Sequence, residues 1–221
     1  MNYKEIRIYA HPRSGSNYFA SIINQNFSRK ENDRDIYGGH KLPGDMVKNN
    51  PSIAYLYIKR DFKSVLDSIF KMKERFGLLV KNKEELENCI YKDIYNPRLK
   101  SYIKFKNNDG SRVESKVSKF FANIEMSPKQ YHELHIRKWE ENEKYQNFYS
   151  VNYNDLMDDF DSTMKRIAVF LGHEIQEFKN IKGKVGYIPP SNGRYYLIMK
   201  FYNNYILKPA IIIYKKYLKQ K

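Results

Sequence analysis

The segment from Ile6 to Phe27 restricts the fold of this chain more than any other part of the sequence. Apolar residues stand at every second position from Ile6 to Ala10, which is the period of a β-strand. They recur at helical spacing from Tyr18 to Phe27, so the period changes within the residues from His11 to Asn17. We therefore predict a strand, a tight turn and a helix.

The turn between this strand and this helix has the features of an anion-binding site. Gly15 can adopt backbone angles that are closed to other residues, and Ser16 or Asn17 can cap the helix. The unpaired amides of the first helical turn and the helix dipole favour a negative charge, and Arg13 adds a fixed positive one. Neither G-x-x-x-x-G-K-[ST] nor G-x-G-x-x-G is present. The turn indicates a phosphate loop of another kind, and a plain glycine turn in the core is the alternative.

The length of 221 residues suits one α/β domain whose core needs no disulfide. A single cysteine, Cys89, excludes a disulfide framework and a cysteine-based zinc site. No run of about 18 apolar residues occurs, and the first strand begins too early to leave room for a signal peptide. We expect a single domain over residues 1–221 and a location in the cytoplasm.

The net charge of +15 is concentrated toward the C-terminus. From Phe178 to Lys221 there are ten Lys and Arg residues and no Asp or Glu, and residues 195–221 form a basic, aromatic tail. Such an asymmetry suggests an anionic partner, for example nucleic acid, acidic lipid, an anionic glycan or a polyphosphorylated nucleotide. A lysine-rich composition spread over the surface explains the tail equally well.

A second strand, loop and helix follow. Ile53 to Ile58 is a run of apolar and aromatic residues, as in a strand buried on both faces of a parallel sheet. Arg60 stands at its end, and Asp61 can cap a helix from about Phe62 to Met72. Parallel strands that alternate with helices predict an α/β fold with its polar residues gathered at the carboxyl edge of the sheet.

The remaining elements are predicted less sharply. Asp35 to Tyr37 suggests a short strand, and residues 73–130 follow no clear pattern and are interpreted as insertions or a lid. Ser127 and Pro128 read as the cap and first residue of a helix. Two further elements are expected. They are a strand over Phe148–Tyr153 and a helix that begins at a cap on Asp161 or Ser162 and ends at Gly172.

Two of these stretches resemble the PAPS-dependent sulfotransferases, where PAPS is 3'-phosphoadenosine 5'-phosphosulfate. Pro-Arg-Ser-Gly-Ser-Asn-Tyr, residues 12–18, is similar to the family's 5'-phosphosulfate loop, P-[KR]-S-G-[TS]-x-[WYL]. The stretch from Tyr57 to Ser68 is similar to the segment in which an Arg closes a strand and a Ser follows eight residues later. The resemblance implies that Arg60 and Ser68 hold the 3'-phosphate, which a guanidinium and a hydroxyl suit.

Two later stretches continue the resemblance in the same order. Residues 149–172 are similar to the family's Y-E-D-L strand end and F-L-G helix, which implies that Tyr153 lies near the adenine. A core-packed tyrosine is the alternative reading. Residues 182–186 resemble the R-K-G-x-x-G loop that closes over the 3'-phosphate, with Ile181 in place of the leading Arg. Lys182 is the ligand that this implies, and Lys184 and Arg194 could replace the missing charge.

The candidate general base is His40. Transfer of a sulfuryl group to a hydroxyl requires removal of the proton from the attacking oxygen, and an imidazole suits this role near neutral pH. The family has its histidine in a T-H-x-P loop, whereas Gly39-His40-Lys41-Leu42-Pro43 has one extra residue before the proline. Lys41 therefore remains an alternative to His40. His11 is interpreted as structural.

The resemblance implies a three-layer α/β fold like that of P-loop NTPases, with a central, mainly parallel sheet flanked by helices. It implies an enzyme that moves the sulfuryl group of PAPS to a hydroxyl or amine of a small-molecule or glycan acceptor and releases PAP. Residues 73–130 would form the acceptor or lid region. His40 and Arg13 are expected to be catalytic. The expected nucleotide ligands are Arg13, Ser14, Gly15, Ser16, Asn17, Tyr18, Arg60, Ser68, Tyr153, Lys182 and Gly183.

No metal is expected, because Arg13 and the loop amides can stabilise the charge of the leaving phosphate. The segment His132 to His135 departs from H-E-x-x-H in spacing and so predicts no zinc site. No specific nucleic acid is expected, while the tail could associate with an anionic surface. The alternatives are a nucleotide or sugar kinase that uses the same phosphate loop, and a basic module that binds nucleic acid or an anionic membrane.

Overall fold

The computed structural model describes residues 3–27, 36–96, 103–106, 112–115 and 118–181. The chain divides into two compact units, and the described residues all lie in the first, Met1–Gly186. The second unit, Tyr187–Lys221, contains the basic tail and lies outside the described residues. The expectations for the tail and for a single domain therefore stay predictions.

The described part of the chain contains a four-stranded sheet in which all neighbouring strands are parallel. Its order is β2 (Tyr37–Gly39), β1 (Glu5–Ala10), β3 (Ile53–Lys59) and β6 (Phe148–Asn152). Parallel strands place all their carboxyl ends at one edge, so the loops that follow the four strands meet there. Strand β2 begins at Tyr37, the last residue of the strand predicted over Asp35 to Tyr37, and Asp35 lies outside the described residues.

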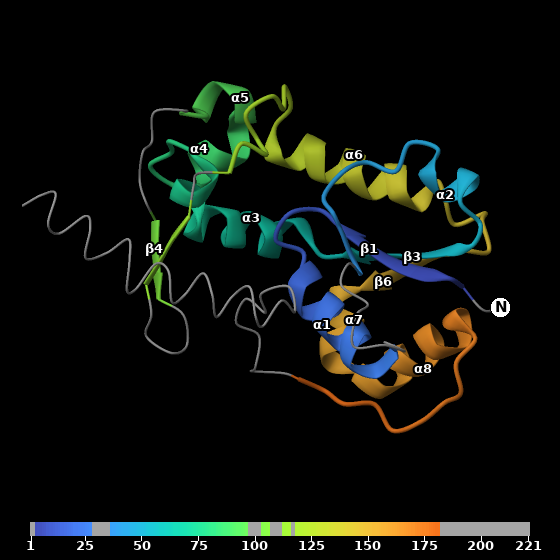
Figure 1. Ribbon diagram of the computed structural model, residues 1–221. Coiled ribbons are helices and arrows are strands. Elements are labelled where there is room, and N and C mark those ends of the chain that lie inside the picture. The colour runs from blue at the N-terminus through green and yellow to red at the C-terminus, as the bar shows by residue number, and fades with distance from the viewer. Residues whose placement is uncertain (1–2, 28–35, 97–102, 107–111, 116–117, 182–221) are drawn as a thin grey trace, which may run out of the picture. The chain divides into compact units, whose positions relative to one another are not determined.

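Helices cover both faces of this sheet, which makes three layers (Figure 1). Ala54, Leu56 and Ile58 of β3 are buried with α1 (Ser16–Phe27) and α8 (Phe160–Leu171) on one face. The alternate residues of β3 are tyrosines, and they are buried on the other face with aromatic side chains of the neighbouring elements. The period of two sends successive side chains to opposite faces, and the predicted α/β architecture is confirmed.

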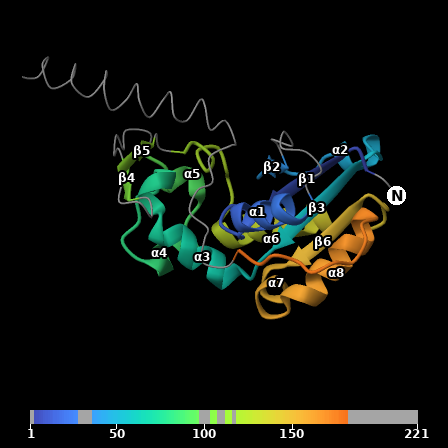
Figure 2. The same ribbon diagram turned by 60° about the horizontal axis from the view of Figure 1, so that its bottom comes forward.

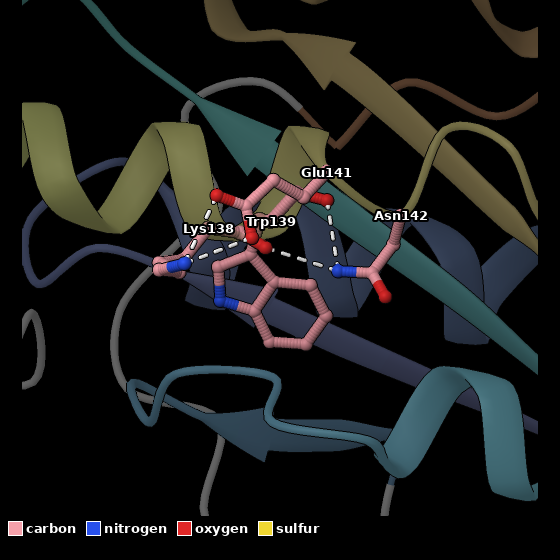
Figure 3. A network of polar contacts seen from close by, with 4 residues as sticks. All are labelled: Lys138, Trp139, Glu141 and Asn142. Atoms are coloured by element: carbon pink, nitrogen blue, oxygen red, sulfur yellow. Dashed lines mark hydrogen bonds and ion pairs between the residues drawn. The ribbon is translucent and has the colours of Figure 1, made fainter.

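The tyrosine face of the sheet packs against α6 (Pro128–Glu140) and α2 (Met46–Asn49). Trp139 of α6 is fully buried, and its ring stacks on Tyr57 with 5.3 Å between ring centroids. The C-terminal end of α6 is closed by polar contacts (Figure 3). Lys138 Nζ donates to the carboxylate of Glu141, and Asn142 Nδ2 donates to the carbonyl oxygens of Lys138 and Trp139.

Two helix starts agree with the sequence predictions. Helix α3 runs from Phe62 to Lys71, and its cap Asp61 accepts a hydrogen bond from the Ser64 amide at 2.8 Å. Helix α6 begins with a capping box in which Ser127 and Gln130 each accept from the other's backbone amide. In both cases the capping side chain satisfies an amide that the helix leaves unpaired.

Two other cap predictions are wrong. The Phe19 amide bonds to the carbonyl of Gly15, which puts Gly15 before the first turn of α1 and Ser16 inside it. Helix α8 begins at Phe160 rather than after Asp161 or Ser162. It begins early because α7 (Tyr153–Asp158) leads into it through a single residue, Asp159. Its predicted end at Gly172, with φ 70°, is confirmed.

The described parts of residues 73–130 form a module with its own core (Figure 2). Phe121 stacks on Tyr91 with ring centroids 4.1 Å apart, and both side chains are fully buried. The module packs against the buried face of α3. Its elements are η1 (Lys73–Phe76), α4 (Lys83–Asn88) and α5 (Tyr91–Ile94). Strands β4 (Ile103–Lys106) and β5 (Arg112–Ser115) form a separate antiparallel pair. No helix in the described residues has the length and apolarity to cross a membrane.

Candidate active site

The loop between β1 and α1 has an unusual backbone. Arg13 has φ 71°, in the left-handed region that residues with a side chain rarely adopt, and Gly15 has φ 90°. The Ser14 amide closes the turn by donating to the His11 carbonyl at 3.2 Å. A non-glycine residue held in this region costs about 1–3 kcal/mol and is found mainly at ligand-binding positions. The loop is thus strained at the residue that carries its positive charge.

Two features exclude a side chain at position 15: the positive φ of its backbone and the close approach of a neighbouring ring. A Cβ atom at this position would lie 2.5 Å from Cε2 of Tyr153, which is the first residue of α7 and follows β6. The Tyr153 ring therefore lies directly against the glycine of the loop. Two segments that are far apart in the sequence are brought together in this way at the carboxyl edge of the sheet.

Two arginines and a serine join the same cluster. Arg13 Nε donates to Ser68 Oγ at 2.9 Å, which ties the loop to the side of α3. Arg60, at the end of β3, reaches back to the Arg13 carbonyl at 3.4 Å. Its guanidinium carbon lies 4.3 Å from the centroid of the Tyr153 ring, within cation–π range. The structure brings Arg13, Arg60, Ser68 and Tyr153 together around the loop.

Buried donors in this cluster point to a ligand. Ser14 Oγ and Arg60 Nε are both buried, and neither has a hydrogen-bond partner among the described residues. Leaving a buried polar group without a partner costs about 1–3 kcal/mol, so a native protein rarely retains one without a reason. Acceptor oxygens of an anionic ligand would satisfy these donors, and the amides at the start of α1 favour the same charge.

His40 follows β2 and lies at the edge of this site. Its Nδ1 is 2.8 Å from the Ala10 carbonyl oxygen, which can only accept, so Nδ1 carries the hydrogen and Nε2 the lone pair. Burial lowers the pKa of His40 and the positive charge of Arg13 lowers it further, while the bond to Ala10 acts in the opposite direction. The imidazole is therefore neutral at pH 7, as a general base must be.

Lys41, the alternative base, has a different environment. Its side chain is exposed, and its Nζ lies 5.9 Å from the centroid of the Tyr9 ring. Tyr9 belongs to the aromatic cluster with Trp139, on the face of the sheet opposite to that of Ala10. The imidazole of His40, in contrast, is bonded to the end of β1, directly before the loop.

The remaining predicted ligands are placed as follows. Ser16 is buried in the first turn of α1, Asn17 is exposed, and the Tyr18 hydroxyl donates to Asn180 Oδ1 at 3.0 Å. Asn180 is near the end of the described residues and precedes the fourth matching stretch. Lys182 and Gly183 of that stretch lie outside the described residues, as do Lys184 and Arg194, so their roles stay predictions.

Three buried histidines beside the site were not predicted as functional. His11 begins the loop, and its ring centroid lies 5.0 Å from that of His132 and 5.5 Å from that of His135, both on α6. His11 Nδ1 donates to the Pro12 carbonyl, and its Nε2 has no partner among the described residues. The spacing of His132 and His135 predicts no zinc site and gives no other local signal of a function. The described residues contain no cluster of His, Cys, Asp or Glu that could hold a metal.

Comparisons with known proteins identify similar structures and a family. A search among curated proteins found no match in sequence. Among solved structures, the chain is similar to the mouse sulfotransferase SULT7A1 complexed with PAP, with a TM-score of 0.51 and 18% identity, over 78% of this chain and 60% of that one. A sulfotransferase from Alicyclobacillus acidocaldarius matches with a TM-score of 0.42 and 10% identity, over 81% of this chain and 76% of that one.

The first of these similarities shows a shared fold, and the chain spans about 60% of the length of that structure. The family assignment comes from a different comparison. The family model described as "Sulfotransferase domain" matches residues 37–184, which is more than half of the chain and includes β2, β3, α3 and β6. The protein belongs to the sulfotransferase domain family.

Proposed function

We propose that this protein transfers the sulfuryl group of PAPS to a hydroxyl or amine of an acceptor, with His40 as general base. The observation that carries the proposal is the convergence of Arg13, Arg60, Ser68 and Tyr153 on the strained loop after β1. These four residues come from four different segments. PAP in the similar mouse structure supports the same ligand class.

The residues of the site fit a nucleotide with charge at two ends. In the proposal, Ser14, Arg13 and the amides at the start of α1 hold the 5'-phosphosulfate end, where a buried hydroxyl lacks a partner. Arg60 and Ser68 hold the 3'-phosphate, for which Arg60 Nε is a buried and unused donor. Tyr153 stacks on Arg60 and orients its guanidinium beside the adenosine.

The chain's own groups then perform two tasks. PAPS, when bound, supplies an activated sulfuryl group. His40 accepts the acceptor's proton at Nε2, because Nδ1 is occupied by the hydrogen bond to Ala10. Arg13 and the loop amides stabilise the negative charge that develops on the phosphate side, so the proposal requires no metal.

The acceptor region belongs to the proposal as well. The Phe120 ring and the imidazole of His40 form a T-shaped pair, with 5.7 Å between the ring centroids. Phe120 lies within residues 73–130, which we propose to supply the acceptor pocket beside the base. The acceptor itself is a small molecule or a glycan with a free hydroxyl or amine.

Calorimetric titration with PAP, ATP and a short oligonucleotide tests the nucleotide assignment. We expect the protein to bind PAP more tightly than ATP and the oligonucleotide, and Arg60→Ala to weaken PAP binding strongly. Arg137→Ala is the matched control, because this exposed arginine on α6 carries the same charge outside the site. If PAP binds no better than ATP, or if Arg60→Ala behaves like Arg137→Ala, the assignment is wrong.

The role of His40 is tested separately. His40→Ala is expected to abolish sulfuryl transfer while PAP affinity persists, because the proposal assigns the nucleotide contacts to the arginines and the loop, and Nδ1 of the ring bonds to the Ala10 carbonyl. Retained turnover in His40→Ala together with its loss in Lys41→Ala would assign the base to Lys41. The association of residues 195–221 with an anionic surface and the cytoplasmic location stay predictions.

A further inference from the structure

We infer that His132 and His135 of α6 are positioning residues, which hold the backbone of the nucleotide-binding Arg60 and of the base His40. This inference rests on the proposed function, because it assigns each histidine to one half of that site. Neither histidine side chain takes part in the proposed reaction. Each donates a hydrogen bond to the main-chain carbonyl of a residue of the proposed site.

His135 connects the sheet to the loop of the base. Its Nε2 lies 3.1 Å from the carbonyl oxygen of His40, and its Nδ1 lies 2.9 Å from the hydroxyl of Tyr57 on β3. A carbonyl only accepts, so Nε2 donates, and Nδ1 of the neutral ring accepts from the tyrosine. The carbonyl of His40 thus fixes the hydrogen on Nε2, and the hydroxyl of Tyr57 supports the same tautomer by donating to Nδ1.

His132 makes the equivalent contact to the other loop. Its Nε2 lies 2.9 Å from the carbonyl oxygen of Arg60, so it also donates to a carbonyl. Residues three apart lie on the same face of a helix, and this face of α6 is turned toward the carboxyl ends of β2 and β3. The two histidines therefore tie the loops after β2 and β3, which flank β1, to a single helix.

Helix α6 is itself fixed firmly enough to serve as such a support. Trp139, fully buried one turn further on, donates from Nε1 to the carbonyl of Lys41 at 3.2 Å. His132 and His135 are 4% and 0% exposed, so neither can exchange its carbonyl partner for water without local opening. Burial keeps both rings neutral at pH 7, each with one hydrogen to donate.

The two contacts predict two separable defects. Loss of the bond from His135 would free the His40 loop, and the base would be less well placed, so kcat falls while PAP affinity is kept. Loss of the bond from His132 would free the Arg60 backbone and weaken PAP binding. A role in packing alone would affect both quantities in both variants to the same degree.

The experiment compares Phe and Gln at each position, measuring PAP affinity by calorimetry and kcat by sulfuryl transfer. Gln keeps a donor near the place of Nε2, whereas Phe keeps only volume. His135→Phe is expected to lower kcat by about tenfold with PAP affinity within about twofold of wild type, the size of one lost hydrogen bond. His132→Phe is expected to raise the Kd for PAP about five- to tenfold. Gln should restore most of each loss.

Equal effects of both Phe substitutions on Kd and kcat would overturn the inference, as would a failure of Gln to rescue. Nitrogen-detected NMR of the wild-type imidazoles is independent of activity and of variant stability. It should show the hydrogen on Nε2 of His132 and His135, and the Nδ1 tautomer at either one would contradict the inference. Absence of PAP binding by the wild type, with the expected tautomers, would instead refute the proposed function and leave the contacts standing.

Discussion

Gly15→Ala should separate the stability of the fold from the geometry of the nucleotide site. Two separate penalties act at this position. The backbone has φ 90°, where a Cβ costs about 1–2 kcal/mol, and that Cβ would lie 2.5 Å from Tyr153 Cε2. Two carbon atoms cannot stay 2.5 Å apart without a bond, so the Tyr153 ring must move away from the loop.

The movement of Tyr153 reaches the ligand site through Arg60. The guanidinium carbon of Arg60 lies 4.3 Å from the centroid of the Tyr153 ring, and a cation–π contact of this kind contributes about 0.5–2 kcal/mol. Loss of that orientation should raise the Kd for PAP by about three- to thirtyfold, since about 1.4 kcal/mol is a factor of ten.

Gly172→Ala is the matched control for this substitution. Gly172 ends α8 with φ 70°, so an alanine there meets a similar backbone penalty at a helix C-terminus. Gly172→Ala should lose about 1–2 kcal/mol in urea denaturation and Gly15→Ala at least as much, and only Gly15→Ala should weaken PAP binding in calorimetry. Equal PAP affinity in the two variants would refute the argument that Tyr153 orients Arg60.

Three further outcomes are expected. Ser68→Ala removes the acceptor of Arg13 Nε and a proposed phosphate donor, so the Kd for PAP should rise about tenfold in calorimetry with little change in melting temperature; an unchanged Kd would exclude Ser68 from the site. Asp61→Ala removes the cap of α3 and should cost about 1 kcal/mol of unfolding free energy in urea, which Asp61→Asn should largely retain. Burial lowers the pKa of His135 from its ordinary value of 6.5 to about 4. Between pH 6.5 and about pH 4, this histidine therefore binds a proton in the unfolded chain but not in the folded one. Stability should therefore fall as the pH drops through this window, by up to roughly 3 kcal/mol from His135, and His135→Gln should show a shallower fall; equal slopes would contradict the buried neutral histidine.

The parts of the fold that could be predicted are those specified by local pattern. Alternation in residues 6–10, the buried run in β3 and the caps Asp61 and Ser127 each act within a few residues of chain. The cap of α8 was mispredicted because its start depends on α7, which brings the chain into the helix at Asp159. No local signal at Asp161 could reveal that.

The candidate site also contains residues that a local motif reveals and residues that it does not. Arg13, Arg60, Ser68 and Tyr153 could be proposed from short motifs, and parallel strands bring them together at one edge. The contacts of α6 could not be foreseen, because His132 and His135 bond to carbonyls of residues that are distant in the sequence. The only local signal was that His132 and His135 lie three residues apart on α6. Many helices carry two histidines at this spacing without contacting a functional site.

The central claim is that the site recognises charge at both ends of one nucleotide. The most direct measurement compares PAP with AMP, which lacks the 3'-phosphate, on the wild type and on Arg60→Ala. We predict that the wild type binds PAP at least about tenfold more tightly than AMP, as expected for a charge-assisted contact, and that Arg60→Ala removes most of this preference while AMP affinity changes little. A wild type that does not distinguish the two nucleotides, or an Arg60→Ala variant that keeps the full preference for PAP, would contradict the account.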